Sequence, residues 1–146
     1  MVEVKDGIFF SANKEDMDVN MIFDFVKNSY WGYLRTFEEQ KIALQNSMNF
    51  GLFYDNKQIA FARVMTDFAF FAYLLDVFVI NEHQGKGYSK ILLENILSYP
   101  TLKSVDKWIL ATKDAHGLYS KFGFEPLKKP ELIMEKMSER SKKIYQ

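Results

Sequence analysis

The spacing of hydrophobic residues predicts both helices and strands along this chain. Residues 8–11 form a short apolar run typical of a strand. From Asp18, whose side chain suits a helix N-cap, apolar residues recur every three or four positions. Thr36 and Glu39 have the types and spacing of a capping box, which predicts a second helix to about Asn46.

Three strands are expected after the second helix. Residues 49–54 and 58–66 are strand-like, and Asp55-Asn56-Lys57 between them suits a tight hairpin turn. Residues 71–79 are apolar except for Asp76, which is typical of a central strand covered on both faces. The three strands predict an antiparallel meander.

In the second half of the chain, segments with the apolar spacing of a helix alternate with strand-like segments. A helix from Tyr88 that ends before Pro100 lies between the strand ending at Val79 and another strand, so the pattern predicts a β-α-β unit with one parallel pair and a mixed α/β sheet. The other expected elements are a strand over 108–112, a short helix over 115–121, a hairpin of 124–127 with 132–137, and a solvated end over 138–146.

Composition narrows the classes of protein and partner. The 146 residues, 48% of them hydrophobic, are expected to form one domain, 1–146. Nineteen basic and nineteen acidic residues give zero net charge, so neither a nucleic acid nor a membrane partner is expected. Cys is absent and the two His lack metal-binding spacing, so no metal is expected. No apolar run approaches the roughly 18 to 20 residues that span a bilayer, and we expect a cytoplasmic protein.

The most specific motif is the loop Gln84-Gly85-Lys86-Gly87-Tyr88-Ser89, which follows a buried strand and opens a helix. Such a junction collects unpaired backbone N–H groups at the positive end of the helix dipole. Its glycines allow close approach of a ligand to the main chain. The loop is therefore a candidate phosphate-binding site.

Two motifs resemble those of the GNAT superfamily of N-acetyltransferases. The loop of that family is Gln or Arg, two residues, Gly, one residue, then Gly or Ala, and Gln84 to Ser89 match it except that Ser89 takes the last small position. The family also has a Tyr in a short helix before a Gly-Phe turn, and here Tyr119 precedes Gly123-Phe124. A third loop glycine, as in dinucleotide-binding folds, is absent.

The resemblance implies a mixed, mostly antiparallel central sheet with helices on both faces and a β-α-β core that binds acetyl-CoA. It implies an N-acetyltransferase whose acceptor is a primary amine of a small molecule, attacking the thioester directly. The alternative is a non-catalytic CoA-binding sensor or interaction module with the same fold, because no good base matches the family's base position.

The resemblance also assigns the cofactor-binding residues. The loop amides would hold the pyrophosphate and the strand before the loop would pair with the pantetheine arm. Asp114 or His116 would contact that arm, although Asp114 also suits a plain N-cap. His83 is expected to face solvent. The full set of candidates is Val77, Phe78, Val79, Gln84, Gly85, Lys86, Gly87, Tyr88, Ser89, Asp114, His116, Tyr119 and Phe122.

The catalytic candidates are Tyr119, Asp76 and Tyr73. Tyr119 would protonate the departing thiolate, unless it is an ordinary buried aromatic residue. The positions most like the family's base are Tyr73 and Leu75, neither a good base at neutral pH. Asp76 is the carboxylate of this strand, but strict alternation places it on the face opposite Tyr73 unless a β-bulge re-aims it. Its alternative role is a buried carboxylate hydrogen-bonded to the first helices.

The candidate acceptor site is the aromatic segment between the first two helices. Tyr30, Trp31 and Tyr33 are suited to stacking on a flat or cationic substrate. Core packing or the contact of a homodimer would use the same residues. Arg35 would bind an acceptor carboxylate or pair with a nearby glutamate.

Overall fold

The computed structural model describes residues 1–145, and in this range the strands form one sheet. Its order is the order of the chain, and each neighbouring pair is antiparallel except β5 and β6, which are parallel. The strands are β1 (Val2–Lys5), β2 (Ile8–Ser11), β3 (Met48–Tyr54), β4 (Lys57–Thr66), β5 (Ala72–Val79) and β6 (Trp108–Ile109).

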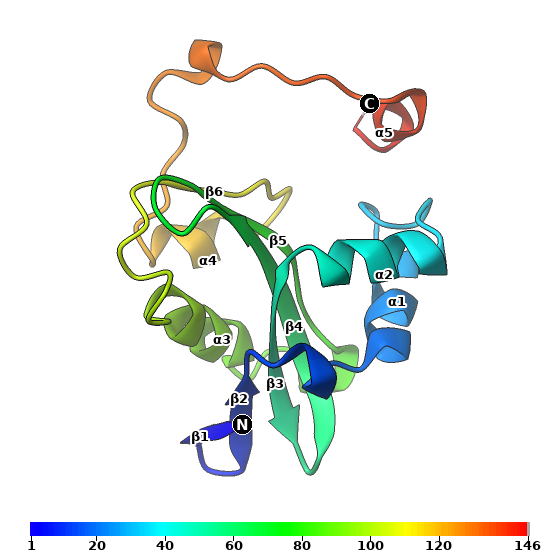
Figure 1. Ribbon diagram of the computed structural model, residues 1–146, viewed down its shortest axis with the longest axis vertical. Helices are drawn as coiled ribbons and strands as arrows, with labels where there is room; N and C mark the ends of the chain where they lie inside the picture. Colours follow the sequence, from blue (N-terminus) through cyan, green and yellow to red (C-terminus); the bar gives the residue numbers. More distant parts are fainter. Residues whose placement is uncertain (146) are drawn as a thin grey trace.

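Helices cover both faces of this sheet. Figure 1 shows α1 and α2 on one face and α3 and α4 on the other. The α-helices are α1 (Val19–Lys27), α2 (Phe37–Gln45), α3 (Tyr88–Leu97), α4 (His116–Ser120) and α5 (Glu139–Ile144); the 3-10 turns are η1 (Lys14–Asp16), η2 (Asn81–His83) and η3 (Pro130–Leu132). The mixed, mostly antiparallel α/β fold with a β5-α3-β6 unit is confirmed.

Local signals placed the first two helices correctly. The Asp18 carboxylate accepts from the Met21 N–H at 3.0 Å and caps α1. At α2 both halves of the capping box form, with Glu39 N–H to Thr36 Oγ1 at 3.1 Å and Thr36 N–H to Glu39 Oε1 at 2.9 Å. These bonds satisfy N–H groups that a helix start leaves unpaired.

The β3–β4 hairpin has a two-residue turn. Asp55 and Asn56 have φ of 52° and 61°, the left-handed values that a type I′ turn requires and that these two residue types tolerate. Lys57, expected in the turn, pairs with Tyr54 as the first residue of β4.

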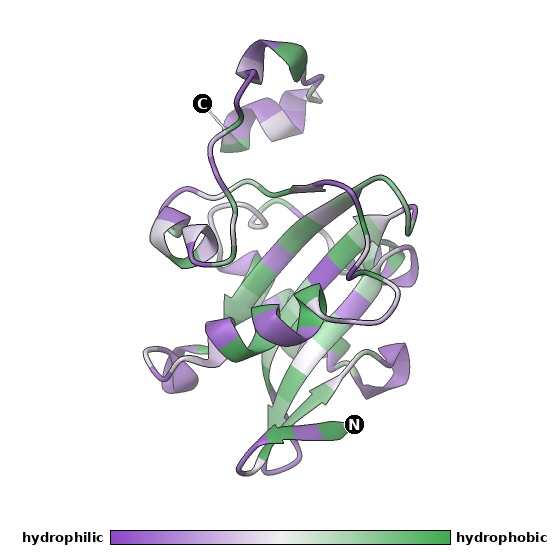
Figure 2. Cartoon of the chain, turned by 90° about the vertical axis from the view of Figure 1, so that its left-hand side faces the viewer, coloured by the Kyte–Doolittle hydropathy of each residue, from purple (hydrophilic) through white to green (hydrophobic). Residues whose placement is uncertain are grey.

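Two hydrophobic cores lie on opposite faces of the sheet. The larger joins α3 to the sheet through residues such as Leu92, Leu93 and Ile96, all fully buried. The smaller joins α1 to the sheet through Ile22 and Val26. In Figure 2 the strands are mostly hydrophobic, as expected for a sheet covered on both faces.

A β-bulge interrupts β5 at Asp76, as the sequence allowed. From Phe78 to Leu75 the chain takes three steps, while the paired residues Phe61 to Arg63 on β4 take two. Asp76 has φ of 53°, an uncommon value outside glycine. Because of the extra residue, Leu74 and Phe78 lie on opposite faces of the sheet, Leu74 in the α3 core and Phe78 in the α1 core.

Three segments toward the ends of the chain differ from the expectation. The N-terminal strand β1 was missed, although Asp6-Gly7 is a hairpin signal and Gly7 has φ of 74°. The expected hairpin of 124–127 with 132–137 is wrong, because these residues form an extended segment with one 3-10 turn. Leu132 and Met134 are exposed and meet no strand to pair with, so their apolar run does not make a sheet edge. Within the expected solvated end, 138–146, residues Glu139–Ile144 form the helix α5, and Gln146 lies outside the described residues. Figures 1 and 2 show α5 beyond the end of the sheet.

Candidate functional site

The glycine loop leaves the first turn of α3 open. Gly85 and Gly87 have φ of 77° and 81°, and Gly87 is the N-cap of α3 without a side-chain cap. A Cβ built on either glycine would meet no atom within 4 Å. The main chain is therefore approachable at the positive end of a ten-residue helix, which is the arrangement that binds phosphate groups.

The side chains of Gln84 and His83 make contacts next to this loop. Gln84 donates from Nε2 to the Val79 carbonyl oxygen at 2.9 Å and to Asn81 Oδ1 at 3.2 Å. The expectation that His83 faces solvent is wrong, because its ring is half-buried between Tyr54 and Tyr88, with ring centroids 5.8 and 5.9 Å away. The side chain of Gln84 therefore positions the loop, and the loop offers backbone groups to a ligand.

Gly87→Ala is expected to weaken CoA binding about tenfold. The alanine adds a Cβ on the open side of the loop, and the left-handed conformation costs a non-glycine residue about 1–2 kcal/mol. Isothermal titration calorimetry with CoA would measure the change. The matched control is Gly117→Ala, which also adds a Cβ in open space but lies in α4 without a positive φ. Equal CoA affinity of Gly87→Ala and the wild type would contradict a role of this loop in binding.

A slot opens between β5 and β6 beside the loop. The two strands pair only at Ala72 with Trp108 and at Tyr73 with Ile109. From Leu74 to Val79, the edge of β5 that faces away from β4 pairs with no strand of the described chain. Unpaired strand N–H and C=O groups can bind the amides of an extended ligand.

The slot widens into a cavity of about 480 Å³, here called the β5–β6 cavity. Its walls come from β5, from residues 110–115 after β6, from α4, from the segment between α1 and α2, and from the C-terminal end. Tyr73, Asp76 and Tyr119 all line it, so the bulge brings Asp76 to the same space as Tyr73.

Tyr119 is the buried phenol of this cavity. It is 9% exposed, and its ring packs edge-on against Phe124 at a centroid distance of 5.9 Å. Burial, followed by the negative charge of Asp114 and the nearby Tyr30, raises the pKa of Tyr119 to about 12. The hydroxyl therefore keeps its proton throughout the neutral range.

Comparison with known proteins decides the family to which this chain belongs. The model of the family described as Acetyltransferase (GNAT) family matches residues 19–124. The chain belongs to this family. The GNAT family transfers acetyl groups from acetyl-CoA, and the resemblance inferred from the two motifs is confirmed.

Solved structures agree with the family model. A Xanthomonas campestris pv. campestris protein assigned to the GNAT family is 39% identical, with a TM-score of 0.87 over 90% of this chain and 93% of that one. A probable acetyltransferase from Staphylococcus aureus is 21% identical, with a TM-score of 0.71 over 90% and 98%. A predicted acetyltransferase from Clostridium acetobutylicum, solved with acetyl-CoA, is 15% identical, with a TM-score of 0.63 over 84% and 92%. The last two comparisons concern the fold alone. A search of curated proteins gives no match.

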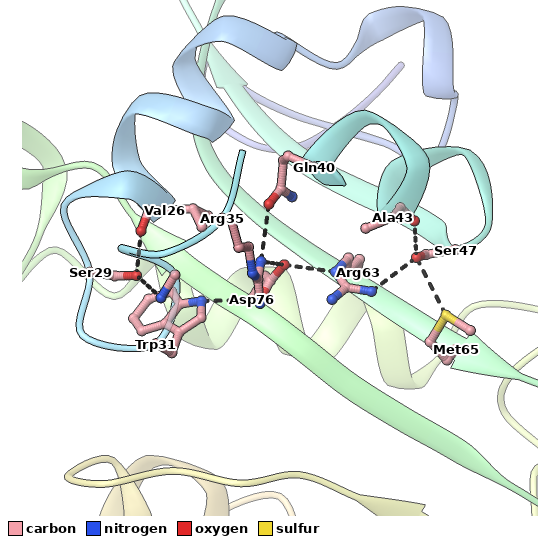
Figure 3. A network of polar contacts seen from close by, with 11 residues as sticks. Val26, Ser29, Trp31, Arg35, Gln40, Ala43, Ser47, Arg63, Met65 and Asp76 are labelled. Carbon is pink, nitrogen blue, oxygen red and sulfur yellow. Dashed lines mark hydrogen bonds and ion pairs between the residues drawn. The ribbon is translucent and has the colours of Figure 1, made fainter. Parts of the chain in front are cut away.

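In this GNAT protein the carboxylate of Asp76 is held by three side chains (Figure 3). Oδ1 accepts from Trp31 Nε1 at 3.1 Å and from Arg35 Nη2 at 3.0 Å. Oδ2 accepts from Arg35 Nη1 at 2.8 Å and from Arg63 Nε at 2.7 Å. Each oxygen thus has two donors, which uses its ordinary accepting capacity. These contacts agree with one half of the alternative left open by the sequence, a buried carboxylate. Its partners differ from those expected, because Trp31 and Arg35 lie between the first two helices and Arg63 lies in β4.

The charges around Asp76 also decide its protonation. Burial by itself would raise the pKa of the carboxyl, but the hydrogen bonds and positive charges of Arg35 and Arg63 outweigh it and lower the pKa below the usual range. A carboxylate so stabilised is a weak proton acceptor. The pKa of Tyr73 is raised by burial and by the nearby Tyr145 and Glu135, so its phenol keeps its proton at neutral pH and does not act as a base.

The aromatic segment contributes in part to the cavity. Tyr30, Trp31 and Arg35 line it, whereas Tyr33 does not. The Tyr30 and Trp31 rings pack edge-to-face at 5.5 Å. The Nζ of Lys113 lies 5.2 Å from the centroid of the Tyr30 ring. The segment thus supplies both a wall and a charged group to the cavity.

Other expected site residues lie apart from the cavity or differ in role. Asp114 lines the cavity but does not cap α4, whose preceding residue Ala115 instead donates to Thr112 Oγ1 at 3.0 Å. His116 is an exposed first residue of α4, and Phe122 packs toward the α3 core. The side chain of Phe78 stacks on Phe25 at 4.0 Å, so only its main chain can meet a ligand in the slot.

Sequence reasoning missed two groups at the site. Ile144 and Tyr145 close the cavity from the C-terminal end, and α5 is held to α2 by Arg140 and Glu39 at 2.9 Å. Arg63 was also missed, although a lone charge inside the apolar pattern of β4 is a signal for a buried ion pair. Among residues 1–145, no helix is long and apolar enough to cross a membrane, and no cluster of three metal-ligating side chains is found.

Proposed function

We propose that this GNAT protein transfers an acetyl group from acetyl-CoA to a primary amine of a small molecule. The observation that carries the proposal is the position of Tyr119, whose phenol lines the β5–β6 cavity where the slot beside the glycine loop ends. A thioester bound along the slot would bring its sulfur toward Tyr119. An acceptor amine would enter from the rest of the cavity.

The chain fits acetyl-CoA in two places. The open N–H groups at the start of α3, with Gly85 and Gly87, would hold the pyrophosphate. The free edge of β5 over Val77 to Val79 would pair with the pantetheine amides, and one of its N–H groups would stabilise the oxyanion. Acetyl-CoA itself supplies the activated acyl group as a thioester.

Tyr119 would donate a hydrogen bond to the departing sulfur. Transfer of its proton, from a pKa of about 12, to a free thiolate whose thiol has a pKa of about 8.5 is uphill by about 5 kcal/mol. Full transfer is therefore unfavourable even after the C–S bond has broken. We propose that the phenol stabilises the developing charge by a charge-assisted hydrogen bond. The departing thiolate then takes its proton from solvent water, which has received the proton that the attacking amine loses.

Water is our proposed acceptor of the amine proton. Asp76 has both oxygens occupied and a lowered pKa, and Tyr73 has a raised pKa. Asp114, the other carboxylate that lines the cavity, would attract the ammonium form. Deprotonation would then occur in solvent or through water at the cavity mouth.

This proposal predicts a pH profile set by the substrate. The value of kcat/KM is expected to rise about tenfold per pH unit up to the pKa of the amine, because only the neutral amine attacks. Tyr119 loses its proton only near pH 12 and adds no falling limb below it. For two acceptors whose amines differ in pKa, the rise of kcat/KM should level off at different pH values. A break near pH 6 to 7 that is the same for both would instead indicate a base on the protein.

Thiol release separates the enzyme from a CoA-binding sensor of the same fold. Purified protein mixed with acetyl-CoA and a panel of primary amines should release CoA at a rate that depends on the amine, and mass spectrometry should find the acetylated product. Tight CoA binding by calorimetry without release for any amine would favour the sensor.

A further inference from the structure

The group of Trp31, Arg35, Arg63 and Asp76, here called the Asp76 network, carries an excess positive charge. Two guanidinium groups share one carboxylate, which leaves a net charge of +1. The three charged side chains are exposed to different degrees, with 1% for Asp76, 11% for Arg63 and 24% for Arg35. Arg35 is therefore the member through which this charge reaches the β5–β6 cavity, which it lines.

Arg35 retains one unused hydrogen-bonding edge. Its Nη1 donates to Asp76 Oδ2 and to Gln40 Oε1, and its Nη2 donates to Asp76 Oδ1, as Figure 3 shows. A guanidinium has five N–H donors in one plane. The remaining two, on Nε and Nη2, lie side by side and find no acceptor among the described residues. Asp76 and Gln40 fix the plane of the group, so this second edge is preorganised.

A parallel pair of N–H donors with excess positive charge matches a carboxylate. One free edge and a net charge of +1 balance a monoanion better than a phosphate dianion, which usually takes more donors. The cavity also contains a carboxylate, Asp114, whose charge acts on both Tyr30 and Tyr119. The cavity thus has a positive charge at Arg35 and a carboxylate whose charge acts on the phenol of Tyr119. Lys113, which also lines the cavity, has its ammonium over the Tyr30 ring.

We propose that the acceptor is a zwitterionic amino acid, with its carboxylate bound by the free edge of Arg35 and its amine directed toward Asp114 and Tyr119. This inference rests on the proposed acetyl transfer and specifies its substrate class. It makes Arg35 a specificity-determining residue and gives Asp76 and Gln40 the function of holding the guanidinium in place.

The test compares amino acids with their primary amides, in which the same amine lacks the carboxylate charge. Acids and amides with α-, β- and γ-amino groups would be assayed for CoA release at matched concentrations of the neutral amine. For the best spacing, the wild type is expected to prefer the acid by about 10- to 100-fold in kcat/KM, the range of charge-assisted hydrogen bonds. Arg35→Lys keeps the charge but loses the paired donors, and should reduce the ratio of kcat/KM for the acid to kcat/KM for the amide about tenfold or more.

Arg63→Lys is the matched control. It makes the same chemical change in a residue that contacts the same Asp76 but does not line the cavity, so it should retain the preference for the acid. Circular dichroism and thermal unfolding would show that both variants fold. Equal use of acid and amide by the wild type, or an unchanged preference in Arg35→Lys, would overturn the proposal.

A binding experiment keeps this inference separate from catalysis. Calorimetric titration of the CoA-loaded protein with the acid and amide of each pair measures recognition without turnover. Tighter binding of the acid, lost in Arg35→Lys and kept in Arg63→Lys, would support the carboxylate site even if no amine were acetylated. Absence of CoA release would then contradict only the proposed function. Equal binding of acid and amide would overturn the carboxylate site.

Discussion

Tyr119→Phe is expected to lower kcat for acetyl transfer by about 100-fold, the lower end of the range for an acid catalyst. The lower end applies because burial and the charge of Asp114 raise the pKa of Tyr119 to about 12, so the phenol donates a hydrogen bond and does not complete a proton transfer. Phenylalanine keeps the ring that packs on Phe124, and the fold should persist. Because the lost interaction forms in the transition state, kcat and kcat/KM should fall equally while CoA affinity stays unchanged.

The leaving group provides a sharper test of this role. If Tyr119 stabilises negative charge on sulfur, an acyl donor with a more acidic thiol needs less help, and the difference between the wild type and Tyr119→Phe should shrink. Tyr73→Phe is the control, because Tyr73 lines the same cavity and is only half-buried. A full rate in Tyr119→Phe, or a rate ratio independent of the thiol, would show that Tyr119 serves only packing.

Asp76→Ala is expected to lower the free energy of unfolding by about 3 kcal/mol, the lower end of the range for breaking a buried ion pair. The loss arises because Arg35 and Arg63 would face one another without the carboxylate that both now bind. The lower end is expected because Arg35 is 24% exposed and can turn its charge toward water. Chemical denaturation monitored by circular dichroism would measure the change. Asp114→Ala, an exposed carboxylate of the same cavity, should change stability by no more than about 0.5 kcal/mol.

Asp76 also makes the stability of the fold depend on pH in acid. Because the folded-state pKa of Asp76 is lowered below its unfolded value, the unfolded chain binds the proton more readily in acid. The contribution of Asp76 is therefore fully present above about pH 4 and is lost as the pH falls toward the folded-state pKa. Asp76→Ala should lose stability less steeply below pH 4 than the wild type. Parallel acid unfolding curves for the two proteins would contradict this account of the Asp76 network.

Short-range signals made the fold predictable. The caps of α1 and α2, the Asp55-Asn56 turn and the glycine loop each depend on residues within four positions of one another, so their chemistry can be read along the chain. The same kind of reasoning failed for residues 132–137. Their apolar run suits a strand, but a strand also needs a partner, and β6 is only two residues long.

The contacts of the site depend on pairs that are far apart in sequence. Trp31 and Arg35 reach Asp76 across 45 and 41 positions, and Arg140 reaches Glu39 across 101. No local pattern marks such pairs, because a charge in the sequence does not reveal its partner. The sequence could therefore name Asp76 as a candidate but not show that four donors occupy its carboxylate.

The sequence by itself determined the family of this protein and predicted the loop that we propose holds the acyl donor. Close approach of phosphate to backbone needs glycines at fixed spacing before a helix, and this requirement is local. Only the tertiary structure decided the make-up of the cavity in which we propose that the acceptor binds. There the β5 bulge, the free edge of Arg35 and the C-terminal residues Ile144 and Tyr145 meet in one cavity, and packing between distant segments sets which donors and charges remain available.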